Sequence, residues 1–304
     1  MLLKGPFKLK ETLQQFMPCA VHSWGTYADI VTHYACNKIK FPHIITLRCF
    51  PMEDAPTRMN PIIGYMLAYF VLHIYKNSKY IVACSKSIKD KMEATYKWAH
   101  LSYIQNGVDI NQFKKMDYKE CRKKMGTKND EIVFISMGSM IPRKRIDETI
   151  EAFLMSNVEN KALWVLGDGY LLEEFKRKYQ NEGIIFWGKI EDVVPYLSAA
   201  DVFVSSSESE GMPNAVLEAI ACEKPVILSN IPQHNEVLET IDGCGISYHL
   251  GDRTELSGII DNINRSDIEI MKKKCSTIFT SSLIMSEMGR KYREYYSKVK
   301  IEDE

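Results

Sequence analysis

The chain has 304 residues, of which 45% are hydrophobic and 26% are charged, and its formal net charge is zero. This composition is typical of a soluble globular protein, and the length is sufficient for two domains of ordinary size. The charge is uneven: residues 1–110 hold 13 Lys and Arg against 7 Asp and Glu, a net +6, so the remainder carries −6. A basic first part favours anionic partners such as lipid head groups, and ordinary solvated surface is an equally good alternative.

The eight cysteines contain no C-x-x-C pair, and most lie in apolar runs such as YIVAC. This pattern indicates buried thiols in a reducing cytosol and argues against a disulfide framework or a zinc site. The start, MLLKGPFKLK, has no long apolar segment, so we expect no signal peptide. Nucleic acid is not an expected partner, because no basic stripe with interleaved aromatic residues is visible.

In chain order, short apolar runs typical of strands alternate with longer helical patterns. The first part reads CAVHS, the helix YADIVTHYACNKI, HIITL, an apolar helix over residues 61–75, YIVACS, a polar helix from Ser87 and LSYIQNG. The 15 residues 61–75 are fewer than the roughly 20 that cross a bilayer. We therefore predict a buried helix there, with an interfacial helix as the alternative.

The same rhythm resumes with EIVFISMG, RIDETIEAFLMS, ALWVLGDG, LLEEFKRKYQ, IIFWG, DVFVSSS, a helix from Asn214 and PVILSN. Short strands buried on both faces and separated by helices predict parallel sheets covered by helices. The fold class is therefore α/β, doubly wound, with ligands expected beyond the carboxyl ends of the strands. A polar stretch around Phe113 separates two such series. It predicts a first domain over 1–113, a second over 114–281, and a C-terminal helix within 282–304 whose apolar stripe packs back toward the first.

The stretch SESEGMPNAVLEA places Glu210 before a Gly-Met-Pro turn and Glu218 within the helix that follows. The first N–H groups of a helix have no intrahelical partner, and the helix dipole is positive at that end, so the start near Asn214 can bind phosphate. A carboxylate on each side could accept hydrogen bonds from sugar hydroxyls. Taken alone, the two glutamates are better explained as a residue that stabilises the helix dipole, Glu210, and a solvated helix residue, Glu218.

Two further strand ends carry glycine loops. MGSMIPRKR has Gly138 followed by three cations, Arg143, Lys144 and Arg145, and LGDG has Gly167 and Gly169. Glycine permits close approach of a backbone to a ligand. One such loop is weak evidence, whereas three in one α/β domain favour a single anion-binding site.

These residues resemble glycosyltransferase family 4, the retaining enzymes of the GT-B fold, which has two Rossmann-like domains facing a cleft. The resemblance is carried by IQNGVDINQF, MGSMIPRKRIDETIEAF, LWVLGDG and the segment from IIFWGKIED to EGMPNAVLEAIACEKPVI. It is strong from Asn106 to Leu238 and extends to most of the chain only at the level of fold.

The resemblance implies roles for individual residues. Glu210 would bind hydroxyls of the donor sugar, and Glu218 would bind the ribose. Lys144 would neutralise the leaving phosphate beside Gly138. The other implied donor contacts are Ser139, Arg143, Gly167, Lys189 and Ile190 near the base, and Gly211, Met212, Asn214 and Ala215 at the diphosphate. His22 and Arg48 match catalytic positions of the first domain.

The chain also departs from the family pattern. An arginine usually follows the first glycine, and this chain has Ser139 there, which Arg143 or Arg145 could replace. The first domain is short, and its first strand–loop–helix unit is not recognisable.

The resemblance implies transfer of a sugar from a nucleoside diphosphate to a glycan or glycolipid acceptor with retained configuration and without a metal or other cofactor. The expected location is the cytoplasm, with peripheral contact at the inner face of an anionic membrane. A non-catalytic nucleotide-sugar-binding relative and a sugar-nucleotide epimerase on the same fold are the alternatives.

Overall fold

The computed structural model describes residues 4–97, 101–128, 130–180 and 183–303. Its contacts divide the chain into two units. The first contains Met1–Asn106, Glu210–Met212 and Ser286–Glu304, and the second contains Gly107–Ser209 and Pro213–Met285. Residues 1–3 of the start segment lie outside the described residues, and the segment that follows them forms a helix that the sequence pattern did not predict.

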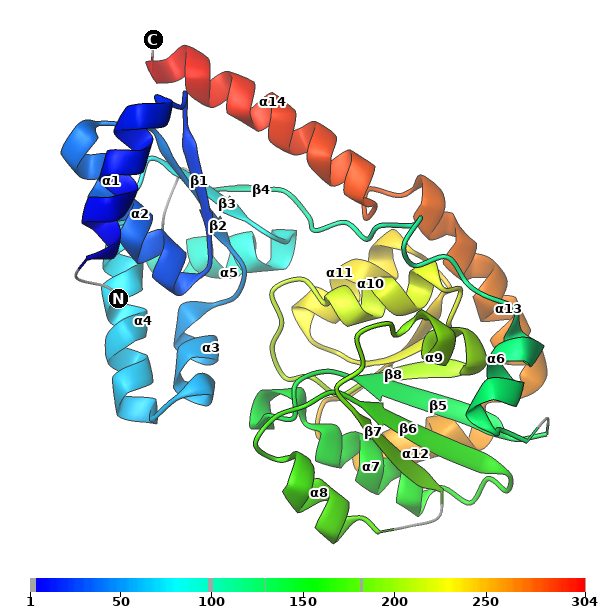
Figure 1. Cartoon of the computed structure of the whole chain (residues 1–304). Coiled ribbons are helices and arrows are strands. Elements are labelled where there is room, and N and C mark those ends of the chain that lie inside the picture. The colour runs from blue at the N-terminus through cyan, green and yellow to red at the C-terminus, as the bar shows by residue number, and fades with distance from the viewer. Residues whose placement is uncertain (1–3, 98–100, 129, 181–182, 304) are drawn as a thin grey trace. The chain divides into compact units, whose positions relative to one another are not determined.

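The first unit is built on a parallel four-stranded sheet in the order β1-β2-β3-β4 (Figure 1). Its strands are β1 (Val21–Trp24), β2 (His43–Leu47), β3 (Tyr80–Ala83) and β4 (Leu101–Tyr103). Its helices are α1 (Gly5–Phe16), α2 (Thr26–Ile39), α3 (Pro51–Arg58), α4 (Pro61–Lys76), α5 (Lys86–Tyr96) and α14 (Met285–Asp303). The four strands coincide with predicted runs, whereas α1 and α3 were not predicted.

Side chains of this sheet alternate between two cores, as expected for strands. Ile45 and Ile81 face a cluster with Val71 of α4 and Ile88 of α5. The residues next to them in sequence point to the opposite face, where they belong to a cluster that includes residues of α14. Its buried members are Ile44, Tyr80, Val82, Ile104, Tyr292 and Val299. The aromatic stripe of α14 is thus partly core, and it belongs to the first unit.

The prediction that the apolar helix 61–75 is buried was wrong for half of its surface. The first ten residues of α4 bury only small residues, Gly64 and Ala68, and expose large ones such as Ile62 and Met66, whereas its C-terminal part buries Val71, Leu72, Ile74 and Tyr75. A Cβ atom on Gly64 would lie 2.6 Å from the Cα atom of Pro56 in α3, so the two helices approach closely at this position. Among the described residues, no helix has the length and apolar character needed to cross a bilayer.

The second unit has six parallel strands in the order β10-β9-β8-β5-β6-β7. They are β5 (Ile132–Met137), β6 (Lys161–Leu166), β7 (Ile184–Gly188), β8 (Val202–Ser205), β9 (Val226–Ser229) and β10 (Gly245–Tyr248). Its longer helices are α6 (Tyr118–Met125), α7 (Ile146–Met155), α8 (Leu172–Lys178), α9 (Val194–Ala199), α10 (Asn214–Ala221), α11 (Pro232–Thr240), α12 (Arg253–Asn262) and α13 (Arg265–Cys275). Short 3-10 helices cover Pro142–Lys144 and Ser276–Thr280. The strand order changes direction between β5 and β8, which is where ligands bind in doubly wound sheets.

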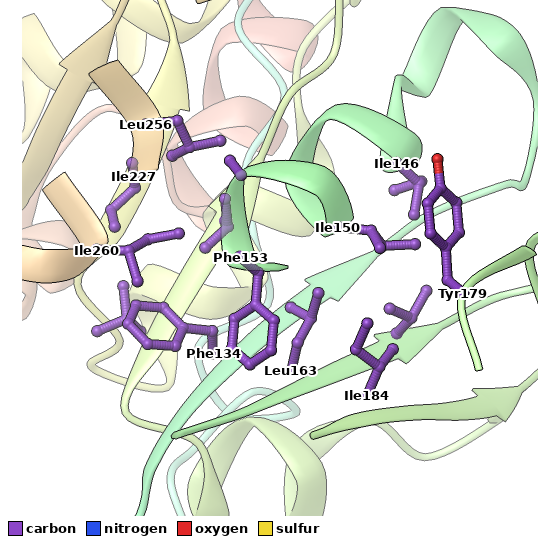
Figure 2. Packing of buried hydrophobic residues seen from close by; sticks show 14 of the residues in the cluster. Phe134, Ile146, Ile150, Phe153, Leu163, Tyr179, Ile184, Ile227, Leu256 and Ile260 are labelled. Carbon is purple, nitrogen blue, oxygen red and sulfur yellow. The ribbon is translucent and has the colours of Figure 1, made fainter. Parts of the chain in front are cut away.

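Figure 1 shows α7, α8 and α12 on one face of this sheet and α9, α10 and α11 on the other. The core beneath α7 is close-packed: Phe134 of β5 meets Phe153 of α7 edge to face, with ring centroids 6.2 Å apart (Figure 2). Ile150 and Leu163 belong to the same cluster. At the far end of the unit, buried Arg122 of α6 pairs with Asp201 at 2.6 Å and fixes the start of β8. This packing fixes the strands whose carboxyl ends carry the loops of the candidate site.

Six of the eight cysteines are buried, Cys49 is partly buried and Cys19 is exposed. All eight are free thiols. Burial raises the pKa of the Cys222 and Cys244 thiols to about 12. Such thiols are protonated and unreactive at neutral pH, which fits a role in packing.

Candidate active site

A cavity of about 380 Å³ lies in the second unit at the carboxyl ends of β5, β6 and β7. Seven residues predicted from the sequence line it: Gly138, Ser139, Gly167, Lys189, Ile190, Ala215 and Glu218. Met137, Leu166, Asp168 and Val193 complete the lining and were not predicted. The cavity extends to α10, which follows β8, and therefore adjoins the boundary between β5 and β8 at which the strand order reverses. A larger apolar hollow of about 510 Å³ beside α12 contains none of the predicted residues.

The loop after β5 places a lysine next to the cavity. Lys144 ends the 3-10 turn Pro142–Lys144, and the following Arg145 adopts a left-handed conformation with φ of 45° before α7 begins. A Cβ atom on Gly138 would lie 3.6 Å from Cδ and Cε of Lys144, which is ordinary contact. Gly138 therefore leaves open space in the lining, directly beside the stem of a cation.

In the loop after β6, Gly167 and Gly169 have a different structural role from that of Gly138. A Cβ atom on Gly167 would lie 1.8 Å from the carbonyl oxygen of Gly138, and one on Gly169 would lie 2.6 Å from that of Met140. Both glycines have positive φ angles, 134° and 155°. The N–H of Met140 donates to the Asp168 carbonyl at 2.9 Å. These glycines are therefore required by the close packing of this loop against the loop after β5, and not only to leave space for a ligand.

The acidic loop before α10 is anchored by the arginine that the sequence placed among the donor contacts. Arg143 is buried, and its Nη1 donates to the carbonyl oxygen of Ser209. The Arg143 carbonyl oxygen in turn accepts a hydrogen bond from the N–H of Glu208 at 3.0 Å. Arg145, the other candidate replacement for the family arginine, bonds the buried carboxylate of Glu148 at 2.6 Å. Through these contacts Arg143 holds the acidic loop and Arg145 holds the start of α7, and contact of either residue with the donor stays a prediction.

Buried hydroxyl groups fix the rest of this loop. Ser206 lies 2.5 Å from the hydroxyl of Thr149 in α7, and Ser229 at the end of β9 donates to the Ser207 carbonyl at 2.6 Å. Nδ1 of His234, a completely buried residue, lies 3.1 Å from the Ser229 hydroxyl. The sequence did not single out these residues, because isolated Ser, Thr and His carry no local signal of a shared network. A rigid loop leads into Glu210 as a result.

The helix α10 begins at Asn214, as the sequence predicts, and presents Ala215 and Glu218 to the cavity. Its first intrahelical bonds run from Val216 and Leu217 to the carbonyl of Pro213. The N-terminus of this helix is thus directed toward the cavity edge, where its dipole favours an anion. Burial raises the pKa of the Glu218 carboxyl above its ordinary value.

In the first unit, the predicted catalytic residues lie in or directly after neighbouring strands. Arg48 is exposed immediately after β2, and His22 lies in β1. Nε2 and Nδ1 of His22 lie 2.7 Å from the hydroxyls of Thr46 and Tyr296. Burial lowers the pKa of His22 to about 4, so the ring is neutral at neutral pH. A neutral imidazole exchanges hydrogen bonds but supplies no positive charge.

Glu210, Gly211 and Met212 group with the first unit by their contacts, and all three are buried. Their assignment to the donor stays a prediction, as do those of His22 and Arg48. Within the described residues, no cluster of three or more His, Cys, Asp or Glu side chains has a metal-binding arrangement.

Comparison with known proteins identifies the family. The pattern of Glycosyl transferases group 1 matches residues 131–263, and that of Glycosyltransferase Family 4 matches residues 1–112. The chain is 30% identical to the Escherichia coli UDP-Gal:alpha-D-GlcNAc-diphosphoundecaprenol alpha-1,3-galactosyltransferase, over 97% of this chain and 79% of that protein. It is 26% identical to the Escherichia coli O-antigen biosynthesis glycosyltransferase WclY, over 98% and 83% of the two chains.

Solved structures show the same fold. Anabaena Alr3699/HepE in complex with UDP-glucose superposes with a TM-score of 0.84 at 17% identity, covering 96% of this chain and 82% of that one. Sucrose-phosphate synthase from Thermosynechococcus elongatus gives a TM-score of 0.82 at 18% identity, covering 98% and 78%. The two parallel α/β sheets, the cavity at the strand ends and these matches lead to one conclusion. The chain belongs to the group 1, family 4 glycosyltransferases and is a nucleotide-sugar glycosyltransferase of the GT-B fold.

Proposed function

We propose that this enzyme transfers a hexose from a UDP-hexose to a hydroxyl of a lipid-linked glycan, with retention of the anomeric configuration. The observation that carries the proposal is the single cavity lined by seven of the predicted donor residues. The choice of UDP and of a diphospholipid-linked acceptor is supported by the relative named above, which uses UDP-Gal and an undecaprenol-linked acceptor. The expected location is the cytoplasm, at the inner face of the cell membrane.

In this proposal the nucleotide follows the cavity from β7 to α10. The base lies against Lys189 and Ile190, and the ribose hydroxyls donate to Glu218. The diphosphate lies at the first turn of α10, where Ala215 lines the cavity, and near Lys144 beside Gly138. A lysine and a helix N-terminus are both favourable for an anionic leaving group.

The transfer step breaks the bond between the anomeric carbon and the diphosphate oxygen and forms a bond from that carbon to the acceptor oxygen on the same face. The proton of the acceptor hydroxyl passes to the leaving diphosphate oxygen. Lys144 stabilises the negative charge that develops on this oxygen, and preorganised donors of this kind contribute about 3 kcal/mol each at the barrier. Glu210 holds the hydroxyls of the sugar, and Arg48 and neutral His22 act on the acceptor side.

We further propose that no metal ion is required, because Lys144 and the helix amides meet the charge of the leaving group. Transfer measured with EDTA present is expected to equal transfer measured with added Mg²⁺. A rate that falls to background with EDTA and returns with Mg²⁺ contradicts this point.

The function is tested with purified enzyme, a panel of UDP-hexoses and a synthetic diphosphoundecaprenol-linked GlcNAc. Expected is one product per donor consumed, with an α linkage visible by NMR. Donor alone is the control that separates the alternatives. Epimerised donor without acceptor indicates an epimerase, and tight UDP-hexose binding with no turnover on any lipid-linked acceptor indicates a non-catalytic relative.

Replacing Glu210 with alanine is expected to abolish measurable transfer while the protein stays folded. The reason is that the carboxylate would no longer orient the sugar at the reacting carbon, and lost orientation costs about 10²-fold or more in rate. Single-turnover rates and circular dichroism measure the two effects. Glu208→Ala, a change of an exposed glutamate two positions earlier, is the matched control. Transfer by the Glu210 variant at the wild-type rate contradicts its assignment.

Donor affinity is expected to fall with decreasing pH. Burial raises the pKa of Glu218, so its carboxylate is lost at a higher pH than that of an ordinary glutamate. Only the ionised form accepts hydrogen bonds from both ribose hydroxyls. Calorimetry with a UDP-hexose should show weaker binding at about pH 5 than at about pH 7.5. Glu218→Gln should bind weakly at both pH values, and a variant that keeps the wild-type pH dependence contradicts the explanation.

A further inference from the structure

The exposed face of α4 carries large apolar side chains at unusual density. Six of the 21 exposed large hydrophobic residues in the described chain lie within nine consecutive positions of this helix. They are Ile62, Ile63, Tyr65, Met66, Tyr69 and Phe70, with exposed fractions between 42% and 72%. We call these six residues the α4 apolar surface. A cluster of this size on a protein surface marks a site of interaction.

Packing within the first unit explains why these residues point outward. The helices α3 and α4 lie side by side (Figure 1), and their close approach leaves no room for a side chain at Gly64, so the large residues near it point outward. On the outer side, Phe70 stacks with exposed Tyr34 of α2, with ring centroids 6.4 Å apart. The apolar surface therefore continues from α4 to a neighbouring helix.

The surroundings of this surface are basic. Residues 30–52 contain three Lys and Arg, residues 55–89 contain five, and neither segment contains Asp or Glu. Arg58, Lys86 and Lys89 pair with the carboxylates of Asp54, Asp90 and Glu93 outside these segments, and the ammonium group of Lys38 lies 4.2 Å from the centroid of the Phe7 ring. Lys38 and Lys40 at the end of α2 and Lys76 at the end of α4 are exposed. Both helices run from the carboxyl to the amino ends of parallel strands, so these three lysines lie at the same edge of the unit. The helices α2 and α4 are in contact. Burial lowers the pKa of His33, and the positive charge of nearby His73 lowers it further.

We propose that the α4 apolar surface inserts into the interfacial region of an anionic bilayer, with Lys38, Lys40 and Lys76 at the lipid phosphates. The uncharged stretch Pro61–Leu72 is too short to span a membrane and suits an interfacial helix. A symmetric dimer formed through this surface fits less well. It would bring the lysines of both copies close together, and residues 30–52 and 55–89 contain no acidic residue that could offset the repulsion. The inference deepens the proposed function, since a lipid-linked acceptor would be presented at this surface.

The test is sedimentation of the full chain with vesicles of phosphatidylethanolamine and phosphatidylglycerol. The variant Ile62→Glu/Met66→Glu/Tyr69→Glu changes three exposed residues and leaves the buried face of α4 intact. It should bind these vesicles at least about tenfold more weakly than wild type. Ile270→Glu, at an equally apolar and exposed position of α13, should bind as wild type. Replacing Lys38, Lys40 and Lys76 with glutamine should weaken binding by about fivefold per residue at low salt.

Two outcomes would overturn the proposal. One is unchanged vesicle binding by the triple glutamate variant. The other is a wild-type dimer in analytical ultracentrifugation that becomes monomeric in this variant, with no vesicle binding by either. Calorimetry with UDP separates this question from the proposed function, since the variant changes no residue of the donor cavity and should bind UDP as wild type does. Loss of vesicle binding with unchanged UDP affinity supports the membrane surface whatever the identity of the transferred sugar.

Discussion

Replacing Lys144 with alanine is expected to lower kcat by about 10²- to 10³-fold, equivalent to about 3 kcal/mol of transition-state stabilisation. The side chain passes Gly138 at the edge of the cavity, where the diphosphate leaves in the proposed reaction. Its charge matters most when negative charge develops on the leaving oxygen, so kcat should fall more than the affinity for the intact donor. Steady-state kinetics and calorimetry with a UDP-hexose measure the two quantities.

A surface lysine provides the control for this experiment. Lys176 of α8 lies 2.8 Å from Glu173 on the exposed side of the second unit, and Lys176→Ala should leave kcat unchanged. Retention of more than about one tenth of the wild-type kcat by Lys144→Ala would show that another group meets the leaving-group charge. The engaged guanidinium groups of Arg143 and Arg145 make them poor substitutes.

Replacing Gly167 with alanine is expected to destabilise the protein strongly. Alanine at this position would place its Cβ atom 1.8 Å from a backbone oxygen, at a φ of 134° that side chains rarely adopt. Strain and overpacking together should lower the free energy of unfolding by about 3 kcal/mol. For a unit of this size the corresponding fall in the thermal midpoint is about 10 °C, measurable by calorimetry.

Gly138→Ala is the matched comparison, because its Cβ atom would meet only ordinary contact distances, to Lys144. It should cost less than about 1 kcal/mol of stability yet weaken UDP binding by about tenfold, since the methyl group occupies the cavity lining. If Gly138→Ala were destabilised and Gly167→Ala were as stable as wild type, the explanation given for the two glycines would be wrong. The pair thus separates a glycine that makes room for ligand from one that makes room for backbone.

Much of the fold could be predicted from the sequence, because strands buried on both faces are continuous apolar runs. The runs FIS in β5 and WVL in β6 are of this kind. The strand β10 escaped prediction, since GISY holds few apolar residues and forms the edge of the sheet. The helix α13 has a largely polar sequence and buries only Ile268 and Cys275, so its local pattern is weak.

The exposed side of α4 could not have been predicted from hydropathy. Nearly every residue from Pro61 to Leu72 is apolar, so periodicity does not distinguish an inner from an outer face. The orientation is set by tertiary contact with α3, where Gly64 is required by the proximity of Pro56. Small residues contribute little to a hydropathy pattern, although here they mark the packed face.

The candidate site was predictable where residue type and strand end coincide. Glycine loops and the Glu218 helix carry strong local signals, and the structure brings Gly138, Gly167 and Glu218 to one cavity. The support of the acidic loop was not predictable, because Thr149, Ser229 and His234 are distant in sequence and meet only through the sheet. The role of Arg143 as a donor contact stays a prediction, and its hydrogen bond to the Ser209 carbonyl could not be inferred from a basic run.

The most direct test of the central claim is a crystal structure of the enzyme with UDP. We expect density for the nucleotide in the cavity at the ends of β5, β6 and β7, with the ribose hydroxyls within hydrogen-bonding distance of Glu218 and the phosphates at the start of α10. Nucleotide bound at another place, with this cavity unoccupied at saturating UDP, would contradict it.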